Sequence, residues 1–291
     1  MHLLTTALRL YDTLEKRWEH PSTQRILAYS LSGLFIILLL LIECARQGWI
    51  PFPTTRHFDA IALVFSLMLL LELAELIFGM VGSFTYSMGK QLEIFSLILL
   101  RAAFKAFAKF DEPIVWEHIT EPLKYMLVDA AGAFVVFVLL AIYYRLHKQH
   151  PITGDPSARA SFIAAKKILA LGLLIGFFII GLLFAYRYVT GQPTFPFFET
   201  FFILLIFSDI FIVLFSLRYS TEYAVVFRNF GFALATVILR LGFIAPEYYR
   251  VAMSLIATIL SIGLVWGYNL YWQQKEQKLT SATPPQAQER E

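Results

Sequence analysis

The sequence holds few of the residues from which catalytic and metal sites are built. Its single cysteine, Cys44, excludes an internal disulfide framework and any multi-cysteine metal site. No Walker A or dinucleotide-binding glycine pattern occurs. None of the six histidines lies inside a long apolar run, which excludes a bis-histidine haem within a membrane. We therefore expect no catalytic residue, no cofactor, no metal ligand and no enzymatic activity, and we interpret "EHITE" at 117–121 as a solvated loop rather than a metal site.

Charge is also scarce, and apolar residues take its place. Only 15% of the residues are charged, 58% are hydrophobic, and the mean hydropathy is +0.65. Soluble domains run at about 25% charged, so the composition indicates a membrane protein whose first partner is the lipid bilayer. The net charge of +3 is too small to imply nucleic-acid binding.

Long apolar windows predict the fold class. A membrane-spanning helix needs about 20 largely apolar residues. The windows that qualify are 26–45, 58–81, 89–109, 123–144, 164–188, 197–217, 225–244 and 248–271. We therefore expect an all-α membrane protein with eight transmembrane helices.

The two ends of the chain differ from the spans. Within 1–24, apolar residues recur at three- and four-residue spacing against a basic face, which predicts an interfacial amphipathic helix. A solvated helix is the alternative. No signal-peptide cleavage pattern follows the first apolar run. The polar, Pro/Gln-rich tail at 275–291 is predicted to be disordered.

The distribution of basic residues predicts the topology. With the N-terminus inside, cytoplasmic segments collect about fourteen Lys and Arg residues and outer loops about six, in line with the positive-inside rule. Both termini and the central linker, 147–162, are then cytoplasmic, which needs an even number of spans. We expect a multi-pass protein of the bacterial inner membrane.

The chain also divides into two similar halves, 25–146 and 163–274. Short matches occur in the same order in each half, such as "SFTY" with "STEY" and "LILLRAAF" with "VILRLGF". Each half contributes an even number of spans, so both enter the membrane in the same orientation. A pseudo-two-fold axis along the membrane normal would relate such parallel repeats.

Each half resembles the four-span phosphate-starvation-inducible E (PsiE) family. The stretch "FSDIFIVLFSL" at 207–217, followed by "VFRNFGFALATVILRLGF", places Asp209, Arg228 and Arg240 at the family's acid and its two arginines. In the first half, Glu72 aligns with the family's acid and Arg101 with its second arginine. Gly89-Lys90 stands at the position of its first arginine, at the start of the third span. The resemblance implies a duplicated four-helix membrane module and a stress-related role, and it brings no mechanism.

Arginines inside apolar runs require counter-ions, because a lone guanidinium in hydrocarbon costs a few kcal/mol. From helical rise alone we predict the outer pairs Glu199–Arg240 and Asp59–Arg101, and an inner pair Asp209–Arg228. A second inner cluster is predicted in the first half from Glu72, Glu75, Lys90 and Glu93. Asp129 is a further expected partner for Arg101 or Lys105.

Two functions remain open for these charges. In the first, every pair pins a helix interface and the protein is a membrane scaffold or accessory factor, acting as a homo-oligomer or with another membrane protein. In the second, carboxylates such as Glu72, Glu75 and Glu93, with Asp209 as a counterpart, line a small-ion or proton pathway. Whether each carboxylate is capped by a base or faces a polar cavity discriminates between the two.

Overall fold

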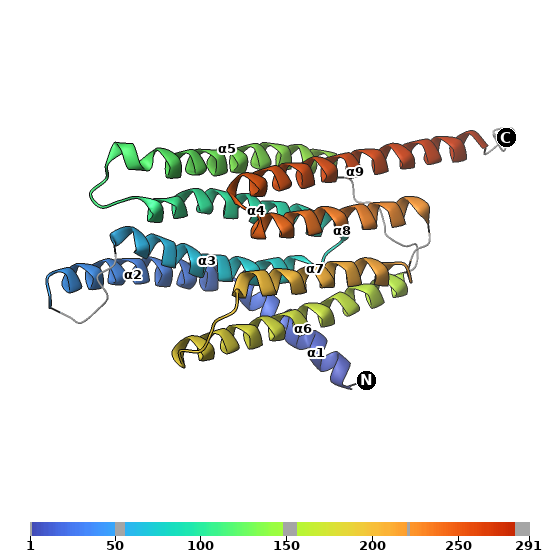
Figure 1. The fold of residues 1–291 in the computed structure, drawn as a ribbon. Helices are drawn as coiled ribbons and strands as arrows, with labels where there is room; N and C mark the ends of the chain where they lie inside the picture. The colour runs from blue at the N-terminus through green and yellow to red at the C-terminus, as the bar shows by residue number, and fades with distance from the viewer. Residues whose placement is uncertain (1, 50–55, 148–155, 220–221, 283–291) are drawn as a thin grey trace, which may run out of the picture.

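The computed structural model describes residues 2–49, 56–147, 156–219 and 222–282, and this part of the chain is helical without a strand (Figure 1). In chain order the elements are α1 (His2–Glu19), α2 (Pro21–Arg46), α3 (His57–Gly79), α4 (Phe84–Lys105), the 3₁₀ turn η1 (Ala106–Lys109), α5 (Trp116–Leu146), α6 (Pro156–Val189), α7 (Phe197–Ser216), α8 (Tyr223–Ile244) and α9 (Glu247–Ala282).

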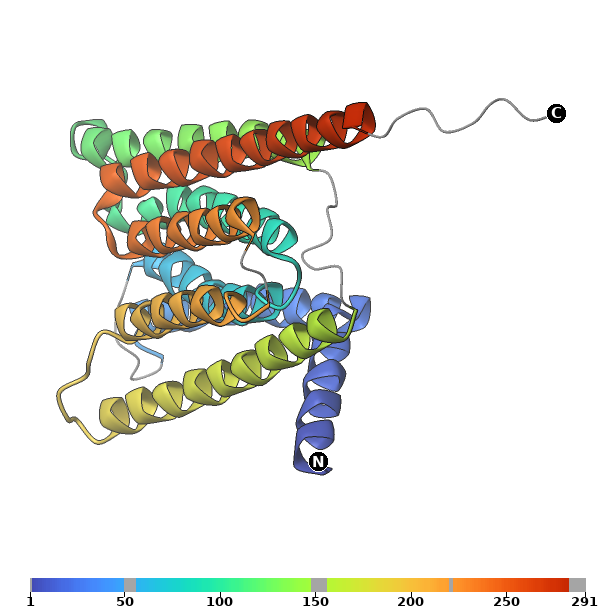
Figure 2. The ribbon, with the colours of Figure 1, turned by 90° about the vertical axis from the view of Figure 1, so that its right-hand side faces the viewer.

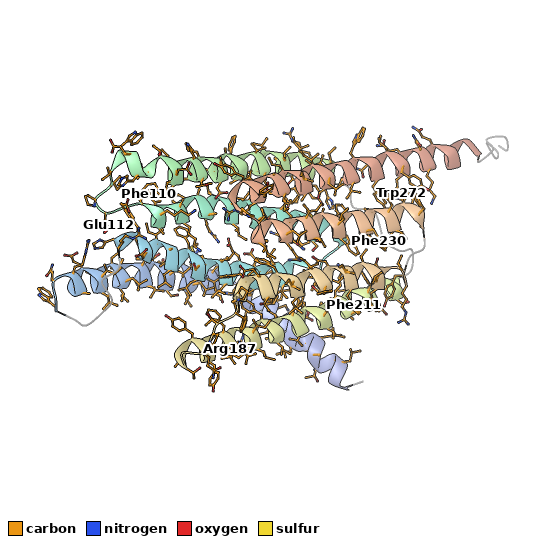
Figure 3. The ribbon with its side chains drawn as sticks, in the orientation of Figure 1. Phe110, Glu112, Arg187, Phe211, Phe230 and Trp272 are labelled. Atoms are coloured by element: carbon orange, nitrogen blue, oxygen red, sulfur yellow. The ribbon has the colours of Figure 1, made fainter. Side chains whose placement is uncertain are left out.

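Seven of these helices are long and apolar enough to cross a membrane, which confirms an all-α, multi-pass membrane protein. They are α2, α3, α5, α6, α7, α8 and α9. Large apolar side chains such as Phe211 and Phe230 are exposed on the bundle surface (Figure 3), as lipid contact requires.

Helix α4 is not among the seven, although it occupies most of the predicted window 89–109. It carries Lys90, Glu93 and Arg101, and many of its residues are buried. Its neighbours are α3, α5, α8 and α9. A helix surrounded by protein needs less apolar surface than one facing lipid.

Consecutive helices pack in the same way in both halves of the chain. Helix α3 lies between α2 and α4, and α4 packs on α5; in the second half α7 lies between α6 and α8, and α8 packs on α9. The halves meet where α5 lies against α9 and α4 against α8 (Figure 2). Helices α2 and α6 are peripheral, with only 6% and 11% of their most apolar windows buried.

Helices α5 and α9 approach closely at Gly132. A Cβ atom added there would lie 2.5 Å from Cγ1 of Val251, closer than atoms can approach without a shift. The absence of a side chain at Gly132 therefore sets the distance between the two halves.

Helix α1 crosses one end of the bundle at a steep angle to the other helices (Figure 2). Its Tyr11 and Trp18 rings each lie 5.8 Å from the Phe78 ring at the end of α3. Asp12 is bonded to Lys167 of α6 at 2.5 Å. The amphipathic helix expected over 1–24 is therefore present, and it is docked on the bundle rather than attached only through the chain.

Three predicted boundaries need correction. Helix α2 already begins at Pro21, and α6 begins at Pro156, inside the predicted linker 147–162. Helix α9 continues to Ala282, so the first part of the predicted disordered tail is helical. The remainder of these two segments, 148–155 and 283–291, lies outside the described residues.

Candidate functional site

The most buried ion pair joins α7 to α8. Arg240 is 1% exposed, and its guanidinium holds the Asp209 carboxylate through Nε–Oδ2 and through a second bond of 3.1 Å. The predicted pairs Glu199–Arg240 and Asp209–Arg228 are both wrong. Side chains on a helix lean toward its N-terminus. The Arg240 side chain therefore extends toward Asp209, in the second half of α7, and away from Glu199, in the first turn of α7.

A corresponding pair joins α3 to α4 in the first half. Arg101 donates to Glu72, whose residue is 5% exposed. The predicted pair Asp59–Arg101 is wrong for the same geometric reason. Asp59 instead accepts a bond of 3.2 Å from Arg56 and caps the start of α3. Arg101 and Arg240 are thus each paired with an acid on the preceding helix, but not with the predicted acids.

A third buried pair crosses between the halves. Arg250, near the start of α9, donates to Asp129 of α5 at 2.8 Å. Asp129 was expected to meet Arg101 or Lys105, and its ion pair with Arg250 corrects that expectation. Sequence reasoning missed Arg250, the third residue of the last apolar window, because its partner Asp129 is 121 residues away in the other half of the chain.

The predicted inner cluster of the first half is divided in the structure. Lys90 bonds Glu93 at 2.8 Å, and the Tyr144 hydroxyl donates to Glu93 at 2.7 Å. Glu72 is held elsewhere by Arg101. Glu75 is exposed and forms no ion pair within the described residues.

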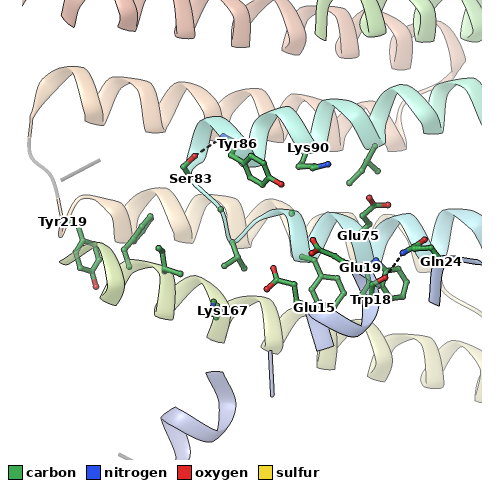
Figure 4. Close-up of a pocket in the computed structure, with 17 residues that line it drawn as sticks. Glu15, Trp18, Glu19, Gln24, Glu75, Ser83, Tyr86, Lys90, Lys167 and Tyr219 are labelled. Atoms are coloured by element: carbon green, nitrogen blue, oxygen red, sulfur yellow. Dashed lines mark hydrogen bonds between the residues drawn. The ribbon is translucent and has the colours of Figure 1, made fainter. Parts of the chain in front are cut away.

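Glu75 faces a cavity of about 570 Å³ at the α1 end of the bundle, bounded by α1, α3, α4 and α6 (Figure 4). Glu15 and Glu19 of α1 also line it, together with Lys90 and Lys167. Burial is the main cause that raises the pKa of Glu15, a bond from Tyr11 lowers it, and the charge of Glu19 raises it. The contribution of α1 was missed because it depends on how α1 docks.

Two buried cations have partners other than carboxylates. Lys166 is 4% exposed and donates to the carbonyls of Met80 and Gly82, at 3.1 and 2.8 Å, so it ties α6 to the turn between α3 and α4. Arg228 bonds the side chain of Asn229 and lies 4.4 Å from the centre of the Tyr268 ring.

Metal-binding groups do not gather anywhere in the described ranges. The segment Glu117–Glu121, expected to be a loop, forms the start of α5, and its His118 pairs with Asp111 at 3.0 Å. Comparison of the chain with protein-family models, with curated proteins and with solved structures finds no match.

Proposed function

We propose that the chain is a non-enzymatic multi-pass membrane protein, acting as a scaffold or accessory factor of the bacterial inner membrane. The observation that carries this proposal is that Glu72 and Asp209 are each held by a guanidinium from the next helix. The bilayer is its first partner, and a second copy or another membrane protein is the expected binding partner.

A carboxylate fixed in this way is poorly suited to transport. It has no free oxygen pair to offer a passing cation, and its release would leave a buried arginine without a counter-ion. Arg240 is the clearest example, since it is almost fully buried. The pairs are therefore best explained as fixing the contacts between α3 and α4 and between α7 and α8.

The proposal includes α4 as an eighth span, with both termini in the cytoplasm. A helix of 22 residues is about 33 Å long, close to the thickness of the hydrocarbon core. The charges of α4 are compensated within the protein by the pairs Arg101–Glu72 and Lys90–Glu93.

We further propose that the two halves arose by duplication of a PsiE-like module. In each half the acid of the second helix bonds an arginine of the third, 29 residues later in one and 31 in the other. The same pairs of helices also pack in each half. The resemblance to the PsiE family rests on the sequence positions of Asp209, Arg228 and Arg240.

A small-ion or proton pathway is the alternative, and one observation favours it. Glu15, Glu19 and Glu75 line the cavity at the α1 end, and none of them forms an ion pair in the described part of the chain. Such a cavity could form the entrance of a pathway, with Glu75 as its first carboxylate.

Ion and proton flux across proteoliposomes tests the two functions. We expect the wild type, Glu72→Gln and Glu75→Gln to behave like protein-free vesicles. Glu121→Gln, an exposed acid at the opposite end, is the matched control. Flux that the wild type supports and Glu75→Gln abolishes, while Glu121→Gln keeps it, would overturn the scaffold proposal and support the pathway.

A further inference from the structure

A second cavity, of about 420 Å³, lies between α8 and α9 toward the α1 end of the bundle. Its walls are almost entirely apolar or aromatic, from Tyr223, Phe227, Leu260, Leu264, Tyr268 and Tyr271. Gly263 and Gly267 also line it, and a Cβ atom added at either would meet nothing within 4 Å. We call this cavity the Arg228 groove, because Arg228 is the one charged residue among the described residues that line it.

The charge of Arg228 lacks a carboxylate partner. The side chain is buried, with the residue 5% exposed, and in the described part of the chain no acid lies within 4.0 Å of its guanidinium. Asp209, the predicted partner of Arg228, is paired with Arg240 instead. Glu222 is paired with Lys275 at 2.5 Å. A buried guanidinium opposed only by an amide oxygen and an aromatic ring is costly, and an external anion would lower that cost.

The position of Arg228 suits the headgroup level of a membrane. It lies five residues after Tyr223, the first residue of α8, which corresponds to about 7.5 Å along the helix. Its side chain leans toward that end, as arginines near a helix terminus do when they reach for the interface. Tyr223 and Tyr271 stand beside the groove, and tyrosine is enriched at membrane–water interfaces.

We propose that the Arg228 groove binds one anionic phospholipid, whose phosphate pairs with Arg228 while one acyl chain lies between α8 and α9. A free anion would use Arg228 alone and leave the apolar walls uncovered. A lipid satisfies both, since its charge compensates the guanidinium and its chain covers the glycine surface of α9. The first half has no such site, because Gly89 stands at the matching position and Tyr144 covers it.

The test measures lipid retained by the purified full chain in detergent, by native mass spectrometry, with phosphatidylglycerol and phosphatidylcholine of equal chain length as probes. We expect the wild type to prefer phosphatidylglycerol at least about tenfold and Arg228→Gln to lose that preference, a change of about 1.4 kcal/mol. The control Arg218→Gln removes an equal charge from the exposed turn after α7 and should keep the preference.

A second variant tests the groove with Arg228 left in place and does not depend on the folding of Arg228→Gln. Gly263→Leu fills the groove where the structure leaves space, so we expect lower occupancy by both lipids in a folded protein. Inorganic phosphate is expected to leave bound phosphatidylglycerol in place. The proposal is overturned if Arg228→Gln keeps the preference, if Arg218→Gln loses it equally, if Gly263→Leu binds normally, or if phosphate displaces the lipid.

Discussion

At the scale of single residues, the buried charges dominate the chemistry of this molecule. The sequence predicts that Arg101 and Arg240 need acids, because hydrocarbon does not tolerate a lone guanidinium. It does not predict which acid, since counting helical rise places each residue at its Cα atom. The arginine side chain extends toward the start of its own helix, and this shift selects Asp209 over Glu199.

Removing the acid of the most buried pair should be strongly destabilising. Asp209→Asn leaves Arg240 buried without a counter-ion, and breaking a buried pair in this way costs about 3–5 kcal/mol. The thermal unfolding midpoint in detergent, read by circular dichroism, should therefore fall clearly below that of the wild type.

Two comparisons make this prediction specific. Glu199→Gln, at the other acid of α7, should change stability by less than about 0.5 kcal/mol. The double variant Asp209→Leu with Arg240→Met should recover most of the loss, because no buried charge remains. A midpoint for Asp209→Asn equal to that of Glu199→Gln would contradict the prediction.

At the scale of helices, apolar windows predict where most spans lie but not how polar helices are accommodated. Every predicted window overlaps a helix, because runs of apolar residues longer than a membrane span leave few alternatives. Helix α4 is the exception in composition, and its charges make sense only beside Glu72 of α3 and Tyr144 of α5. The docking of α1 could not be predicted either, since Asp12–Lys167 joins residues 155 apart.

The membrane topology of α4 can be tested with a thiol reagent that does not cross membranes. In a Cys44→Ser background, eight spans place Glu117→Cys outside and Arg218→Cys inside. Labelling of intact cells should therefore modify the first variant and spare the second until the membrane is opened. If α4 does not span, α5 enters from the inside and every later helix is inverted, so Glu117→Cys is protected and Arg218→Cys is labelled instead.

The docking of α1 should weaken as the pH rises. Burial raises the pKa of Glu15, with Tyr11, Glu19, Lys167 and Asp12 as the neighbours that modify it. Because the raised pKa favours the protonated acid in the docked state, docking is strongest below the ordinary range of a glutamate. Its stability is lost as the pH rises from about 4.5 through the raised value.

Trp18, which packs on Phe78, reports on this docking. The fluorescence difference between the wild type and Trp18→Phe should shift toward longer wavelength as the pH rises through this range. Glu15→Gln should show little pH dependence, because its side chain is neutral throughout. An unchanged pH dependence in Glu15→Gln would assign the titration to another group.

At the scale of the whole molecule, the two halves meet mainly through α4, α5, α8 and α9, and also where α6 lies against α3. The ordered matches between 25–146 and 163–274 predict two modules of one kind, but not which faces meet. That choice depends on small features that no pattern of apolar residues reveals. Gly132 opposite Val251 and Asp129 opposite Arg250 are two of them.

The close approach at Gly132 gives a test of this interface. In Gly132→Ala the new methyl group overlaps Val251, whose branched side chain is held near the helix backbone, so we expect a loss of about 1–3 kcal/mol in unfolding free energy. Gly172→Ala, where nothing lies within 4 Å, should be neutral or gain up to about 1 kcal/mol from helix propensity. Equal midpoints for the two variants would show that Gly132 does not set the spacing.

The place of α9 in this arrangement has a consequence for biosynthesis. Helix α9 packs on α8 and also on α5, and its Asn269 donates to the carbonyl of Leu146, 123 residues earlier. The ribosome synthesises α5 long before α9. Until α9 is inserted, the face of α5 that packs on α9 has no native partner in the bilayer. The contacts of α9 with α5 can therefore form only after α9 itself has been translated.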